Sequence, residues 1–219
     1  VPMKPTLSLF TNGSEDTWSS IEYGAWMAAN MQTRLTLTGV SEGHANDASV
    51  EEIFSRAVSL FQENNVDYAL KLADGNVEDI IIRSARPDED GRILIFGPFG
   101  RPQIRRMLVG RSFRHIMAEV SAPILYVPIA KIPLRRVLIC QGGLGYTVTA
   151  EHLGLKVAGM NKASVTLLTV VPPIDLDYPE SRKIRENWQN LADTDTITGR
   201  HLRQGLEIAR AAGLAKVIR

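Results

Sequence analysis

The sequence predicts an α/β protein with an open parallel sheet of five strands and helices on both faces, present once in full and a second time in part. Three observations lead to this prediction. Short apolar segments alternate with amphipathic segments of helical length, as in βαβ units. Several of the apolar segments have few polar interruptions, as strands buried on both faces do. The first strand, helix and strand also return 130 residues later in the chain.

The elements of the first copy follow from apolar periodicity and turn residues. The run Leu7–Thr11 is closed by the turn Asn12-Gly13-Ser14 and predicts the first strand. The clearest helix has apolar residues at i, i+3, i+4, i+7, i+8 and i+11 from Val50. In chain order we expect strands at Leu7–Thr11, Leu35–Val40, Val66–Leu72, Ile93–Phe96 and Ile124–Val127, and helices at Trp18–Met31, Val50–Phe61, Val77–Ser84 and Phe113–Val120, with a loop at Ser41–Ala48.

The repeat becomes visible when the sequence is shifted by 130. Leu7–Val40 then aligns with Val137–Val170 without a gap, and 7 of the 34 pairs are identical, among them Gly24 with Gly154. We interpret this as two copies of one domain, at 1–132 and 133–219. The second copy is expected to have a longer loop, from about Pro172 to Gly199, and to be incomplete, because only the start of its third strand is present.

Composition excludes several classes of function. Of 219 residues, 25 are Lys or Arg and 24 are Asp or Glu, so the balance predicts no general affinity for nucleic acid or an anionic membrane. No apolar run is long enough to span a bilayer, and the first residues do not resemble a signal peptide. The single cysteine, Cys140, fits a reducing compartment and is expected in the core. We therefore expect a cytoplasmic protein.

One segment has the chemistry of a phosphate-binding loop. Gly97, Gly100 and Gly110 form the pattern Gly-x2-Gly-x9-Gly after the fourth strand, and Arg111 and Ser112 follow at the start of a helix. Glycines at a strand end allow close approach of the backbone, and a helix N-terminus favours an anion. Two alternatives stay open: the glycines are only strand-end turns, and the nearby arginines are only a solvated face.

Three stretches resemble the universal stress protein family. GPFGRPQIRRMLVGRSFRHIMAEVSAPILYVP, from Gly97, is similar to the family's glycine signature, final helix and final strand. The opening LSLFTNGSEDTWSSIEYGAWMAANMQTRLTLTGV resembles its first strand, helix and second strand. VLICQGGLGYTVTAEHLGLKVAGMNKASVTLLTVVPP, from Val137, looks like the same opening in a second, tandem domain.

The resemblance implies a site for an adenine nucleotide, ATP or AMP, with Mg²⁺ only if ATP is bound. By position, Asn12 would meet the adenosine moiety and the backbone near Val40 the adenine, while the phosphates would lie among Gly97, Gly100, Gly110, Arg111 and Ser112. Two residues depart from the family pattern. Asn12 stands where the family has an acidic residue, and Arg111 stands where it prefers Ser or Thr.

No residue pattern predicts catalysis. The dehydrogenase fingerprint, the kinase-type phosphate loop and the hydrolase nucleophile elbow are all absent, and no metal-ligand spacing is found. We therefore expect a non-enzymatic stress-response or regulatory protein, although slow ATP hydrolysis is not excluded. The alternative is a nucleotide-free interaction module of the same fold. In either case the strand Ile124–Val127 is expected at a sheet edge, where it pairs with another copy or is covered by the second domain.

Overall fold

The computed structural model describes residues 5–43, 47–85, 91–100, 113–142, 148–170, 180–211, 213–214 and 217–218. The chain divides into two compact units, Val1–Lys131 and Ile132–Arg219. Among the described residues, no helix combines the length and the apolar character that a membrane span requires.

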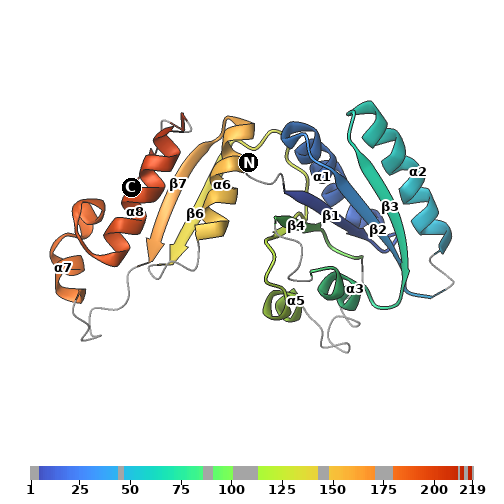
Figure 1. Ribbon diagram of the computed structural model, residues 1–219, viewed down its shortest axis with the longest axis horizontal. Helices are drawn as coiled ribbons and strands as arrows, with labels where there is room; N and C mark the ends of the chain where they lie inside the picture. Colours follow the sequence, from blue (N-terminus) through green and yellow to red (C-terminus); the bar gives the residue numbers. More distant parts are fainter. Residues whose placement is uncertain are drawn as a thin grey trace. The chain divides into compact units, whose positions relative to one another are not determined.

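The first unit is built on a five-stranded parallel sheet, which confirms the predicted fold class (Figure 1). The strand order is β3-β2-β1-β4-β5. β1 and β4 lie inside the sheet, and their side chains are buried on both faces, as the apolar runs predict. The strands are β1 (Thr6–Thr11), β2 (Leu35–Ser41), β3 (Tyr68–Asp74), β4 (Arg92–Phe96) and β5 (Ile124–Tyr126).

Among the described residues of this unit, four helices and a short 3₁₀ turn cover the sheet. α1 and α2 contact each other, and α3 contacts α5. Figure 1 shows these two pairs on opposite faces of the sheet. The pairing follows from right-handed crossovers, because the chain adds strands on one side of β1 and then on the other. The elements are η1 (Glu15–Thr17), α1 (Trp18–Met31), α2 (Asp47–Glu63), α3 (Val77–Ser84) and α5 (Phe113–Glu119).

Both edge strands of the first unit carry exposed apolar side chains. β5 ends the sheet on one side, as predicted for Ile124–Val127, and Tyr126 is 45% exposed. β3 ends it on the other side. Its apolar alternation correctly predicts a strand, yet Leu70 and Leu72 are both exposed. An edge strand has a neighbour on one side only, so alternation identifies the strand without guaranteeing burial.

The second unit repeats the start of the first unit's topology. Its strands are ordered β6-β7-β8 and are all parallel. Both ends of α6 lie 130 residues after the ends of α1, and the register Val137↔Val165 repeats the register Leu7↔Leu35. The elements are β6 (Arg136–Gly142), α6 (Val148–Asn161), β7 (Ser164–Val170), α7 (Ser181–Glu186), η3 (Trp188–Asp193), α8 (Ile197–Ala211) and β8 (Val217–Ile218).

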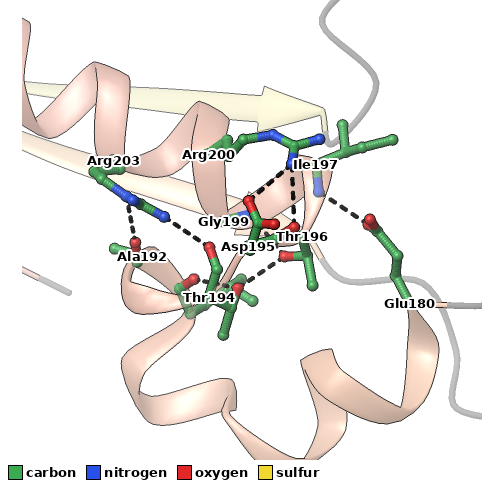
Figure 2. A network of polar contacts seen from close by, with 10 residues as sticks. Glu180, Ala192, Thr194, Asp195, Thr196, Ile197, Gly199, Arg200 and Arg203 are labelled. Carbon is green, nitrogen blue, oxygen red and sulfur yellow. Dashed lines mark hydrogen bonds and ion pairs between the residues drawn. The ribbon is translucent and has the colours of Figure 1, made fainter.

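The long loop predicted from Pro172 to Gly199 is wrong in its second half. α7 and η3 lie within it, and α8 begins at Ile197. Polar contacts join these elements (Figure 2). Arg203 of α8 donates to the carbonyl oxygens of Ala192 (2.9 Å) and Thr194 (2.8 Å). Glu180 accepts a hydrogen bond from the backbone N–H of Ile197 at 2.9 Å. Helices of six residues show too little apolar periodicity to be recognised in a sequence.

The prediction that Cys140 belongs to the core is also wrong. Cys140 lies in β6, but its side chain is exposed. Both α6 and α8 pack on the other face of this sheet, in one core cluster with Ile139, Val165 and Leu167. Cys140 therefore lies on the face that these helices leave uncovered, together with Leu138 (60% exposed) and Leu168 (45% exposed).

Candidate site at the carboxyl ends of the first sheet

The first sheet has a topological switch point between β1 and β4. From β1 the chain adds β2 and β3 on one side, and then β4 and β5 on the other. Crossovers to opposite faces make the loops after β1 and β4 diverge, and ligands of open parallel sheets bind in the crevice formed there. Asn12 directly follows β1 and Gly97 directly follows β4. Two residues predicted from the sequence thus flank the switch point.

Asn12 holds the strand ends together. Its side chain is buried, with 5% exposure, although it is polar. The Nδ2 group donates to the carbonyl oxygen of Phe99, in the segment after β4, at 3.0 Å. It also lies 3.5 Å from Oε2 of Glu42, which follows β2. Oδ1 accepts from the N–H of Ser14 at 3.2 Å. One amide therefore links the carboxyl ends of β1, β2 and β4.

Glu42 is a member of this site that the sequence analysis missed. Its Oε1 accepts a hydrogen bond from the N–H of Val77, at the start of α3, at 3.3 Å. Its Oε2 is the partner of Asn12. The side chain is half-buried, so a carboxylate remains within reach of solvent at the switch point. Its position directly after the second strand was the available signal, because the carboxyl ends of parallel strands meet at one edge of the sheet.

The two described glycines of the pattern have packing reasons for being glycine. A Cβ at Gly97 would lie 2.8 Å from the carbonyl oxygen of Val127. Gly100 has φ +62°, and a Cβ there would lie 2.0 Å from Oγ of Ser14. The segment after β4 therefore rests against the loop after β1. A bulky residue at Gly100 would disturb these loops directly, so the substitution would not test phosphate binding alone.

At Val40 only the backbone is available to a ligand, because the side chain is buried. The side chain is fully buried in a core cluster with Phe10, Val77 and Phe96. The ladder between β1 and β2 ends at the pair Thr11↔Gly39, and β2 continues to Ser41. The backbone of β2 thus extends past the end of β1, and its contact with an adenine stays a prediction.

The phosphate half of the predicted site lies outside the described residues. Gly110, Arg111 and Ser112 fall in the range 101–112, and their predicted roles stay predictions. Elsewhere, among residues that the structure does describe, no three His, Cys, Asp or Glu side chains come together as metal ligands would.

The second unit has different residues at the matching strand ends. Gly142, which ends β6, occupies the position that Asn12 has after β1. Its described sheet consists of β6, β7 and β8, which correspond in order to β1, β2 and β3. Within those strands there is no counterpart of β4 and therefore no switch point.

No protein-family model matches the chain, and no curated protein matches it either. Solved structures of universal stress proteins are similar to it. One, in complex with cAMP, is 17% identical, covers 56% of this chain and 95% of its own, and has a TM-score of 0.46. A second, from Archaeoglobus fulgidus, is 15% identical, covers 57% and 98%, and has a TM-score of 0.44. A third, from Archaeoglobus fulgidus in complex with dAMP, is 16% identical, covers 58% and 99%, and has a TM-score of 0.39. At these identities and scores, the likeness alone supports no statement about a ligand.

Proposed function

We propose that the first unit binds one adenine nucleotide, ATP or AMP, across the carboxyl ends of β1, β2 and β4, and that the chain is a universal stress protein-like regulator and not an enzyme. The observation that carries this proposal is the junction at Asn12, where one buried amide connects three strand ends at the switch point. The choice of an adenine nucleotide rests on the resemblance of the glycine pattern and of the opening strands.

Glu42 has a specific part in this proposal. The family has an acidic residue where this chain has Asn12, and Glu42 supplies a carboxylate beside that asparagine. A ribose offers hydroxyl donors, for which a carboxylate oxygen is a stronger acceptor than an amide oxygen. Asn12 and Glu42 would together bind the ribose, with the amide orienting the carboxylate. Gly97 and Gly100 would present backbone toward the phosphates, and Mg²⁺ would enter only together with ATP.

Calorimetric titration of the full chain with ATP and with AMP tests this function. We expect one nucleotide per chain. Glu42→Gln removes the charge but keeps the shape, and should raise the dissociation constant about tenfold, or about 1.4 kcal/mol. Glu63→Gln, at the exposed end of α2, makes the same charge change and should leave affinity unaltered. A stoichiometry near two, or equal affinity in the Glu42 and Glu63 variants, would contradict the assigned site.

The nucleotide-free interaction module is the second candidate, and one observation favours it. The donor and the acceptor of Asn12 are both used inside the protein, and Gly100 lies against Ser14. Loops whose polar groups bond one another in this way need no nucleotide to satisfy their hydrogen bonds. Mass spectrometry of small molecules released by heat denaturation separates the candidates: released ATP or AMP supports nucleotide binding, whereas a blank without any thermal shift supports the module.

We further propose that the chain is a tandem protein of the cytoplasm whose edge strand β5 makes a protein contact. Among the described strands of this sheet, β5 is the last one on its side, and edge strands are commonly paired or covered. Pairing with another copy, or coverage by the second unit, would protect the backbone N–H of Tyr126 from exchange. Hydrogen exchange of the full chain measures this directly. A monomer whose Tyr126 amide exchanges at the rate of an open loop would contradict the contact.

A further inference from the structure

A cavity lies on the α3 face of the first sheet, apart from the carboxyl ends of the strands. Its volume is about 310 Å³, within the range of small-ligand sites. It arises because α3 has only eight residues and is therefore about 12 Å long, whereas β2 has seven residues and spans about 23 Å. The short helix covers part of this face and leaves a hollow beside it.

The floor of the cavity is defined by the register of three strands. Ser8 is paired with Thr36, and Thr38 lies between Phe10 and Lys71. Ser8 and Thr38 are largely buried, at 6% and 7% exposure. Within the part of the chain that the structure describes, the hydroxyls of Ser8, Thr36 and Thr38 make no hydrogen bond. Hydroxyls at such positions are available to a ligand as donors and acceptors.

The described part of the lining is basic. Among the residues that the structure describes, the lining includes three basic side chains, Lys71 of β3, Arg83 of α3 and Arg92 of β4, and no acidic one. Arg92 is oriented by a hydrogen bond from Nη1 to the carbonyl oxygen of Ser84. Burial lowers the pKa of Arg92, because the guanidinium is partly withdrawn from water. A carboxylate or phosphate would form charge-assisted hydrogen bonds with basic side chains in such a lining.

Apolar surface completes the lining. Phe10 is fully buried and Ile80 is 9% exposed, and both border the cavity. Ala73 of β3, which is paired with Val40, lies on the same face of the sheet and also lines the cavity. A ligand that fits this arrangement combines a small apolar body with one or two anionic groups. A few placed polar groups around an apolar wall are typical of small-molecule sites.

We propose that this cavity binds a small organic anion carrying a carboxylate or phosphate group, with its charge toward Lys71, Arg83 and Arg92 and its polar atoms toward the hydroxyls of Ser8, Thr36 and Thr38. The site differs from the nucleotide site in position. It lies on one face of the sheet and is lined by side chains of β1, β2, β3, α3 and β4, whereas the nucleotide would lie beyond the strand ends.

Amide chemical shifts of the full chain, titrated with inorganic phosphate and separately with succinate, test the proposal. The two probes distinguish phosphate from carboxylate recognition. We expect at least one of them to give saturable, single-site shifts at Phe10, Thr38 and Ala73. Lys71→Gln should raise the dissociation constant about fivefold or more, since a charge-assisted hydrogen bond is lost.

Two further variants make the result specific. Thr38→Val removes a hydroxyl at nearly constant shape, and should weaken binding severalfold while the melting temperature is maintained. Lys131→Gln, exposed beyond the opposite edge strand β5, makes the same charge change as Lys71→Gln and should leave binding within about twofold. Shifts centred on Asn12, Glu42 and Phe99, no saturation with either probe, or equal effects of the two lysine substitutions would overturn the proposal.

Discussion

The two units place similar strands in different surroundings. In the first unit, Phe10 of β1 is fully buried in a cluster that includes residues of α3 and α5. In the second unit, the position 130 residues later is Cys140 of β6, which is exposed. The other face of each sheet is buried in both units. Leu9 of β1 and Ile139 of β6 lie on that face, and each is buried beside the helix that follows its strand. The units therefore share one half of a sheet core and differ in the other.

The difference shows what a strand's own sequence determines. Apolar residues predict a strand, but the crossover helices decide whether one face or two are buried. α1 and α2 have counterparts in α6 and α8, whereas α3 and α5 have none among the described residues of the second unit. The glycine variants below test a helix–strand contact that both units have, whereas the Thr196 and Arg56 variants test contacts that only one unit has.

The largest effect is expected at the glycines that both copies place in their first helix. A Cβ at Gly24 of α1 would lie 2.5 Å from Cδ2 of Leu9, whereas a Cβ at Gly154 of α6 would lie 3.1 Å from Cδ1 of Ile139. Gly24→Ala should therefore destabilise the first unit by about 1–3 kcal/mol, since overpacking exceeds the gain in helix propensity. Gly154→Ala should change stability by less than about 1 kcal/mol.

Hydrogen exchange measured by mass spectrometry assigns each effect to its own unit within the intact chain. Peptides from α1 and β1 should lose protection in Gly24→Ala, and peptides from α6 and β6 should keep it in Gly154→Ala. The opposite order of effects, or equal ones, would show that the two helix–strand contacts differ in a way that these distances do not describe.

The sequence predicted an element correctly where apolar periodicity runs along its whole length. Both ends of the helix Trp18–Met31 were correct, because an apolar stripe runs its whole length between turn residues. The parallel sheet was also predicted correctly, from the βαβ pattern. Less of the site was predictable. Asn12 was assigned to the site by the family resemblance, but its hydrogen bond to Phe99 depends on a contact across 87 positions of sequence. Such a contact leaves no local pattern.

A moderate effect is expected at the insertion that only the second unit has before its second helix (Figure 2). Thr196 is fully buried, and its Oγ1 accepts from the N–H of Gly199 at 3.0 Å and pairs with Oγ1 of Thr194 at 2.8 Å. Thr196→Ala removes this helix cap and should cost about 0.5–2 kcal/mol. Thr196→Ser keeps the hydroxyl and should retain most of the stability. Urea unfolding of both variants measures the effect.

The loss in Thr196→Ala should be localised as well. Exchange protection should fall in η3 and α8, which the cap joins, and should be unchanged in α2 of the first unit. If Ser and Ala at this position are equally destabilising, the methyl group and its packing matter more than the hydrogen bond. The insertion would then be held by apolar contacts, as the first unit's helices are.

The smallest effect is expected at a contact between helices that the second unit cannot form. Arg56 of α2 lies over the ring of Trp18 in α1, 4.1 Å from the ring centroid, and forms an ion pair with Glu15. The position matching Trp18 in the second unit is Val148, which has no π face. Arg56→Ala should cost the first unit about 0.5–1 kcal/mol, the usual value for an exposed cation–π contact.

The cation–π and ion-pair contributions of Arg56 respond differently to salt and to Arg56→Lys. The ion pair with Glu15 is partly exposed and should be screened in about 1 M salt, whereas the stacked guanidinium should be less affected. Arg56→Lys keeps the charge but loses the planar group. Of the stability that Arg56→Ala loses, it should therefore retain only the salt-sensitive part. Urea midpoints of the three proteins at low and high salt measure both contributions. Full recovery of the wild-type urea midpoint by Arg56→Lys, at either salt concentration, would mean that the ring contact adds nothing to the stability of the first unit's helix pair.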